Sequence, residues 1–168
     1  MRTRTLLVLA MGLMMISAGI SRTQQTGRSS SKTGSIIYTN RMFGFEFHLP
    51  TTWKGFKIVA KTWDGDNDHG QNYQHGPLIL IRHPLWTDDD PHEDIPIMVF
   101  TLAQWQMIEK ETLDVSAAPF PPGELGRNNK YVFATPPRYS YDELDRVEEV
   151  IHIINSGALH PIPPSSAH

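Results

Sequence analysis

Alternating apolar and polar residues predict strands in the first half of the chain. Residues 43–49 place Phe or Leu at every second position until Pro50, which is the period of a strand with one buried face. Residues 55–63 alternate in the same way, and residues 36–38 fit a short edge strand. We therefore expect Phe45, on the apolar side of its strand, to be buried.

Uninterrupted apolar runs predict further strands. The first run covers residues 78–81, as expected of a central strand that is covered on both faces. A second run covers residues 95–100, where Pro96 is compatible only with a strand end. A third covers residues 131–134 and stops before two prolines.

Two segments have helical spacing. Thr101 and Gln104 form a capping-box signature, and the helix after them should bury one face, formed by Leu102, Trp105, Ile108 and Thr112. Ser140 and Glu143 form a second signature, and the apolar positions after it are Leu144, Val147, Ile151 and Ile154. Gly157 is suited to end this helix in a left-handed cap. Together these patterns predict the α+β class, an antiparallel β-sheet flanked by helices.

The ends of the chain differ in composition from its middle. Residues 1–21 combine Arg2 and Arg4, an apolar run and small residues, the layout of a cleavable signal peptide. We expect a flexible leader over residues 22–35 and one domain over residues 36–157. Residues 158–168 are rich in proline and are expected to form a disordered tail.

Composition excludes several classes of protein. The 168 residues are 39% hydrophobic and include no cysteine, which excludes disulfides, thiolate metal sites and cysteine nucleophiles. The formal charge of −3 becomes −5 if the signal peptide is removed. A mildly acidic chain without a basic stripe is poorly suited to bind nucleic acid or anionic lipid. We expect a secreted or periplasmic protein that has no stable membrane anchor after cleavage.

Several motifs resemble a known superfamily. The strand at residues 44–47, followed by Pro50 and Trp53, resembles the opening of PsbP-like proteins. Four later blocks resemble a group of exported bacterial proteins of unknown function: residues 81–86, 94–101, 125–128 and 131–134. The resemblance implies a PsbP-like α-β-α sandwich, a fold whose members mostly act as binding or assembly subunits. It supplies no catalytic residue, and it does not support a role in photosystem assembly.

Aromatic and charged residues near strand ends are candidates for a binding site. Arg82 and His83 follow a buried strand, and Trp86 comes shortly after, so they could hold an anionic ligand against an aromatic face. The simpler alternative is that Arg82 pairs with a nearby acid such as Asp94. The full set of candidate ligand-binding residues is Trp63, Arg82, His83, Trp86 and Arg138.

An acidic loop is a weak candidate for calcium. Asp64, Asp66 and Asp68 alternate along it, and such carboxylates can converge on a hard cation. The EF-hand pattern fails because glycine comes one position late, at Gly70, and because His75 stands where a bidentate acid is needed. A solvated turn explains the loop equally well, and the scattered histidines lack the spacing of a zinc site. We expect no cofactor.

Three functions stay open after these observations. The first is an exported, non-catalytic binding or accessory module, whose ligand would be a protein or a small anion. The second is an exported hydrolase that uses His83 and Asp94 as an acid–base pair. The third is a cell-surface protein that presents its proline-rich tail to a partner. No nucleophile elbow, phosphate loop or dinucleotide fingerprint is found in the sequence.

Overall fold

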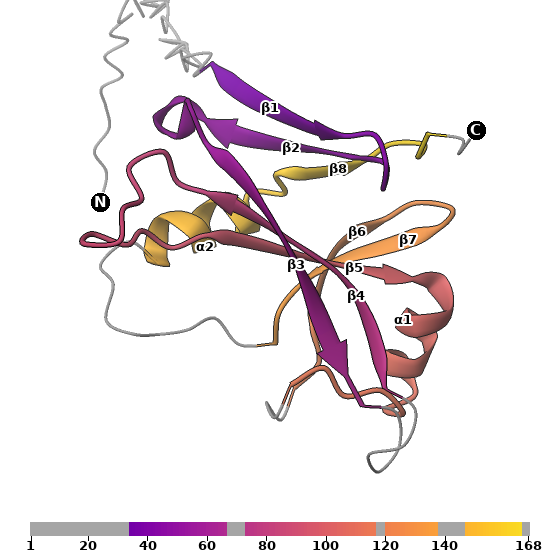
Figure 1. Ribbon diagram of the computed structural model, residues 1–168. Coiled ribbons are helices and arrows are strands. Elements are labelled where there is room, and N and C mark those ends of the chain that lie inside the picture. The colour runs from indigo at the N-terminus through magenta and orange to yellow at the C-terminus, as the bar shows by residue number, and fades with distance from the viewer. Residues whose placement is uncertain (1–33, 67–72, 117–119, 138–146, 166–168) are drawn as a thin grey trace, which may run out of the picture. The chain divides into compact units, whose positions relative to one another are not determined.

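In the part of the chain that the structure describes, the alternating segments and the apolar runs fold into two antiparallel sheets, accompanied by two α-helices (Figure 1). The computed structural model describes residues 34–66, 73–116, 120–137 and 147–165, which all belong to the unit Lys32–His168. The predicted α+β class is confirmed. The sequence predicts a single sheet, whereas the described strands pair in two separate sheets. A short 3₁₀ helix over Thr51–Trp53 lies on the connection from the first sheet to the second.

The smaller sheet contains the Phe-rich alternating segment. Its strands are β1 (Ser35–Asn40), β2 (Phe45–Pro50) and β8 (Leu159–Pro161), in the order β1-β2-β8. Phe45, Phe47 and Leu49 are at most 1% exposed, while the residues between them are partly exposed. This confirms the predicted burial of Phe45 and the register of β2.

The larger sheet contains the apolar runs. Its strands, in order across the sheet, are β3 (Lys57–Gly65), β4 (Gln74–Arg82), β5 (Ile95–Thr101), β7 (Tyr131–Thr135) and β6 (Gly123–Arg127). The central strand β5 is buried from Ile95 to Phe100. The edge strand β3 is different, because the residues before Trp63 are exposed or only partly buried.

Side chains from both sheets share one core. Phe45 of β2 packs against Phe133 of β7, with ring centroids 4.9 Å apart. The same cluster includes Ile81 and Ile97 of the larger sheet and Val150, from the segment after β7. A second cluster contains Trp63, Phe100 and Trp105, among others. Burying rings of this size is the main favourable term in folding.

The helix α1 (Leu102–Glu109) begins with the predicted capping box. The Thr101 hydroxyl accepts a hydrogen bond from the Gln104 amide, and the Gln104 side chain accepts one from the Thr101 amide. The buried face is narrower than predicted, since it consists of Trp105 and Ile108. Leu102 is 37% exposed, and Thr112 lies beyond the helix, because α1 ends at Glu109.

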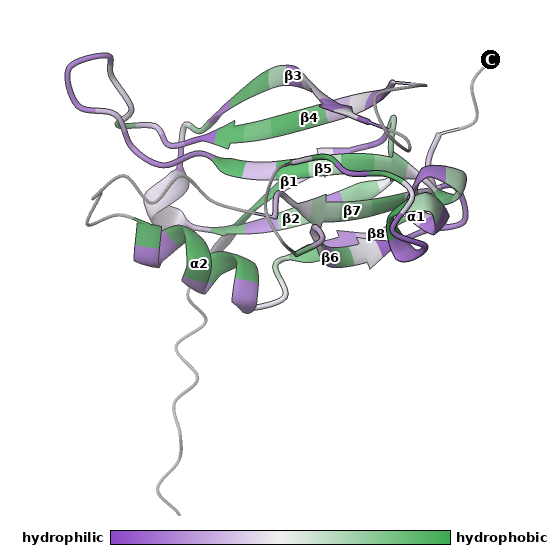
Figure 2. Cartoon of the chain, turned by 90° about the horizontal axis from the view of Figure 1, so that it is seen from below, coloured by the Kyte–Doolittle hydropathy of each residue, from purple (hydrophilic) through white to green (hydrophobic). Residues whose placement is uncertain are grey.

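The helix α2 (Val147–Asn155) is amphipathic, as Figure 2 shows by its green and purple residues. Val147, Val150 and Ile153 are buried, whereas Ile151 and Ile154 are only partly buried. The predicted face is therefore wrong beyond Val147, because the contact with the core follows a spacing of three residues. Gly157 has φ +73° and ends the helix as expected. The capping box at Ser140 and Glu143, with Leu144, lies outside the described residues.

The C-terminal segment differs from the expected disordered tail. Leu159–Pro161 forms β8 and pairs with Phe45–Phe47 of β2, and both Ala158 and Leu159 are buried. The domain thus extends beyond residue 157, because two apolar residues ahead of the prolines complete the smaller sheet. At the other end, β1 begins at Ser35, and the predicted signal peptide lies outside the described residues. In the described ranges, no helix is long and apolar enough to cross a membrane.

Candidate functional site

Arg82, at the end of β4, is tied to two neighbours. Its guanidinium donates to both carboxylate oxygens of Asp94, at 3.1 Å from Nε to Oδ1 and 2.9 Å from Nη2 to Oδ2. The same guanidinium lies 3.9 Å from the centroid of the Trp86 ring, a cation–π contact. The hydrogen bonds to Asp94 raise the pKa of Arg82. An anionic ligand would therefore have to compete with Asp94, which is the simpler alternative stated above.

His83 is a buried residue, 7% exposed. Its imidazole stacks on His92 with ring centroids 4.3 Å apart, and it meets the Trp53 ring edge to face at 4.9 Å. Its Nδ1 atom accepts a hydrogen bond from the amide of Leu85 at 3.2 Å. His83 and His92 therefore lie side by side. The imidazole of His83 also contacts the Trp53 ring and the Leu85 amide.

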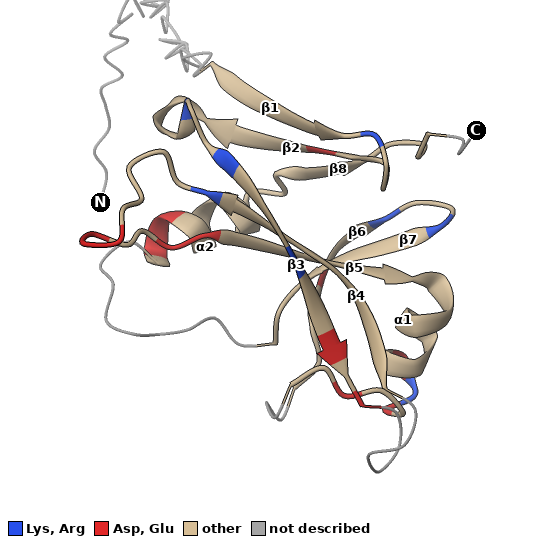
Figure 3. Ribbon diagram, in the orientation of Figure 1, with Lys and Arg blue, Asp and Glu red and all other residues tan. Residues whose placement is uncertain are grey.

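The loop between β4 and β5 is strongly acidic, and Figure 3 colours its acidic residues red along the ribbon. Asp88, Asp89 and Asp90 are exposed. Burial raises the pKa of Glu93, and the nearby charge of Asp94 raises it further. This surface of negative charge around Arg82 is poorly matched to a small anion.

Trp63 lies away from this group. It pairs with Gly76 across β3 and β4, whereas Arg82 pairs with Lys57, and six strand positions correspond to roughly 20 Å. The Trp63 side chain is 4% exposed, and its Nε1 donates to the Val99 carbonyl at 2.9 Å. Trp63 is therefore part of the core.

Arg82, His83 and Trp86 do come together, and Arg138 lies outside the described residues.

The acidic loop proposed for calcium is described only in part. Asp64 is exposed at the end of β3, Asp66 lies just after it, and Asp68 is outside the described residues. The backbone of Asp66 forms an isolated bridge with Asp114. Among the described residues, one side-chain oxygen of Asp66 is buried and has no hydrogen-bond partner. In the ranges that the structure describes, no group of three or more acids and histidines is placed to hold a metal ion.

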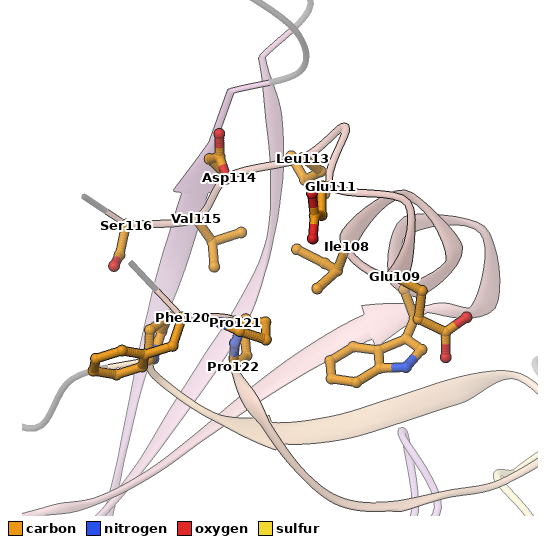
Figure 4. Close-up of a pocket in the computed structure, with 12 residues that line it drawn as sticks. Ile108, Glu109, Glu111, Leu113, Asp114, Val115, Ser116, Phe120, Pro121 and Pro122 are labelled. Atoms are coloured by element: carbon orange, nitrogen blue, oxygen red, sulfur yellow. The ribbon is translucent and has the colours of Figure 1, made fainter. Parts of the chain in front are cut away.

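A pocket that the sequence analysis missed lies beside α1 (Figure 4). Its volume is about 590 Å³, within the range usual for small-molecule sites. It lies between α1, the segment after this helix and the prolines that lead into β6. The lining residues are Trp105, Ile108, Glu109, Glu111, Leu113, Asp114, Val115, Ser116, Phe120, Pro121, Pro122 and Pro137.

The turn that ends α1 places Glu111 in the pocket wall. The Glu111 amide donates to the Ile108 carbonyl at 3.0 Å, and the Thr112 amide donates to the Met107 carbonyl at 2.9 Å. These are the two hydrogen bonds of a Schellman motif. Glu111 has φ +55°, a left-handed conformation that costs roughly 1–2 kcal/mol for a residue with a Cβ atom.

The segment after this turn, residues 113–115, is hydrogen-bonded to the residue that follows β3. Asp66 and Asp114 exchange two backbone hydrogen bonds, of 2.8 and 3.0 Å. Gly65 permits this contact, since a Cβ there would lie 2.9 Å from the Asp114 carbonyl oxygen and 3.0 Å from Leu113. The wall that carries Leu113 and Val115 is thus held by backbone contacts as well as by the core.

The pocket combines apolar walls with negative charge. Among the described residues that line it, Glu109, Glu111 and Asp114 are acidic and none is a Lys, Arg or His. Arg127 lies 3.7 Å from Glu109 and also pairs with Glu124, so the charge of Glu109 is partly neutralised. The hydrogen bonds from Arg127 lower the pKa of Glu124.

The sequence held only faint signals of this pocket. Trp105 and Ile108 read as an ordinary core face, and the segment 120–122 reads as a loop. The one available signal was the end of α1, where no glycine stands to form the cap.

Comparison of the chain with protein-family models, with curated proteins and with solved structures finds no match.

Proposed function

We propose that this protein is an exported, non-catalytic binding or accessory module and that the pocket beside α1 is its ligand site. The observation that carries the proposal is the cavity of about 590 Å³, lined by aromatic, aliphatic and proline side chains together with a few acids. Apolar walls with a small number of polar groups are the usual composition of a small-molecule site. A binding role does not require an acid–base pair, which catalysis by a hydrolase would need.

The alternative function, a hydrolase based on His83 and Asp94, receives less support. Both oxygens of Asp94 accept hydrogen bonds from Arg82, so a substrate proton would have to compete with this guanidinium for the carboxylate. The imidazole of His83 is covered by His92 and Trp53, so a substrate has little access to it. A general base must come within hydrogen-bond reach of the proton that it removes.

A matched pair of variants tests the pocket. Phe120 is 51% exposed and lines the pocket, whereas Leu85 is 66% exposed and lies in the β4–β5 loop. We expect Phe120→Ala to weaken the binding of a neutral probe with an aromatic body, 4-phenylbutanol, at least threefold, since it removes an apolar wall. Leu85→Ala should leave binding unchanged. Equal losses in the two variants, measured by calorimetry, would place the ligand elsewhere.

A screen of chromogenic p-nitrophenyl esters, phosphates and glycosides tests the alternative. We expect no turnover above background from the wild-type protein. Turnover that disappears in His83→Ala, while the circular dichroism spectrum stays unchanged, would establish the hydrolase and refute the binding module.

For the fold, we propose the PsbP-like α-β-α sandwich that the sequence resembles. The antiparallel sheets, the amphipathic α2 and the shared core of the two sheets are compatible with it. The PsbP-like fold also accords with a binding role, since its members mostly bind or assemble with other molecules. An experimental structure in which helices cover only one face of the sheets would exclude a sandwich.

We also propose export to the periplasm or the medium, which rests on the layout of residues 1–21. Mass spectrometry of the protein from its native host should find an N-terminus at about residues 18–25, the span expected of a signal-peptide cleavage site. Recovery of intact Met1 in a cytoplasmic fraction would contradict export. This outcome would leave the pocket proposal standing.

A further inference from the structure

The two helices end in similar turns but with different residues at the left-handed position. Gly157 occupies this position after α2, with φ +73° and open space where a Cβ would lie. Glu111 occupies it after α1, with φ +55°. Glycine is the residue that suits this conformation. The glutamate after α1 is therefore kept at a cost in stability, and such positions concentrate at ligand sites.

The carboxylate of Glu111 is directed into the pocket. Figure 4 shows it extending toward Ile108, while the carboxylates of Glu109 and Asp114 lie farther out. Arg127 pairs with Glu109 and Glu124. In the part of the chain that the structure describes, no basic side chain forms an ion pair with Glu111, so its charge is available to a ligand.

From this arrangement we infer that the pocket takes a small organic cation, an amine carried on an apolar body, and that Glu111 selects its charge. The inference rests on the proposed function, since it assigns a ligand class to the same pocket. Phe120, which is 51% exposed, offers the apolar body an aromatic surface, to which ammonium groups are also attracted. Of the lining residues that the structure describes, three are acids and none is a base, so a cation is complementary to this part of the pocket and an anion is repelled.

Three molecules with one body and different head groups test the ligand class. The probes are 4-phenylbutylamine, 4-phenylbutanol and 4-phenylbutyrate, titrated into the full chain by isothermal calorimetry. We expect the amine to bind about threefold to tenfold more tightly than the alcohol, the range for a partly exposed charge pair with a cation–π contact. The carboxylate should bind more weakly than the alcohol.

Variants at position 111 test the role of the glutamate. In Glu111→Gln the amine should lose its advantage over the alcohol, while the affinity for the alcohol stays the same. Glu148→Gln, which removes an exposed charge from α2, should keep the advantage. Glu111→Gly should raise the melting temperature by about 2–4 °C and still lose the preference for the amine.

The possible results separate the two proposals. If the alcohol binds as tightly as the amine, the cation inference is overturned and the pocket proposal survives. An amine preference that persists in Glu111→Gln would also overturn the inference. If none of the three molecules binds, both proposals fail. A lower melting temperature in Glu111→Gly would show that Glu111 supports the fold, and it would remove the argument from the left-handed turn.

Discussion

Phe45→Ala should lower the free energy of unfolding by about 3–5 kcal/mol, the usual scale for deleting a buried aromatic side chain. Phe45 is 0% exposed. Its ring lies 4.9 Å from that of Phe133 in the larger sheet and 5.8 Å from that of Tyr38 in β1. Because these contacts join both sheets, the cavity left by alanine cannot be filled by movement of a single loop.

The matched control is Ile37→Ala, on the neighbouring strand β1. Ile37 is 49% exposed, and an exposed side chain should change stability by no more than about 0.5 kcal/mol. Urea unfolding of both variants measures the difference. A cost below about 1 kcal/mol for Phe45→Ala would mean that the register of β2 is wrong.

Gly44→Ala should destabilise the protein by at least about 2 kcal/mol, through two separable effects. Gly44 has φ +79°, which disfavours any residue with a Cβ. In addition, an added Cβ would lie 2.5 Å from the Ile162 carbonyl oxygen and from the Pro164 nitrogen. Both contacts are with backbone atoms, so the C-terminal segment would have to move.

Gly157→Ala separates these effects. Gly157 has a similar φ of +73°, but nothing lies within 4 Å of its added Cβ, so only the conformational cost of roughly 1–2 kcal/mol applies. Gly44→Ala should also speed hydrogen exchange at the amides of Ile162 and Ser165, which donate to the Gly44 and Arg41 carbonyls. Equal destabilisation by the two substitutions would show that the C-terminal segment does not pack against Gly44.

Local pattern predicted the strands of the fold well, because burial on one face leaves a strict period of two. The alternation around Phe45 and the apolar run at residues 95–100 both correspond to observed strands. The strand β6 was missed, since Gly123–Arg127 contains only one apolar side chain and pairs at the edge of its sheet. The strand β8 was missed because the proline-rich sequence that begins at Pro161 resembles a disordered tail. The segment is a strand because it pairs with β2, which the local sequence does not indicate.

The candidate sites depend on contacts between residues that are far apart in the sequence. The pairing of Arg82 with Asp94 was among the stated alternatives, since a strand end and the start of the next strand often meet. Trp63 could not be placed without the register of β3 and β4, which sets it six positions from Arg82. The pocket is lined by α1 together with residues 113–116 and 120–122. No local sequence pattern indicates that these segments lie together.

Titration of ¹⁵N-labelled protein with 4-phenylbutylamine tests most directly whether the pocket beside α1 is the ligand site. The chain has four tryptophans, and the indole resonances of Trp105, Trp53 and Trp86 serve as reporters because these three side chains have different neighbours. Trp105 lines the pocket, Trp53 contacts His83 and Trp86 lies over Arg82. We predict that the Trp105 resonance shifts and saturates, while those of Trp53 and Trp86 stay in place. A saturating shift of Trp86 with no movement of Trp105 would contradict this assignment.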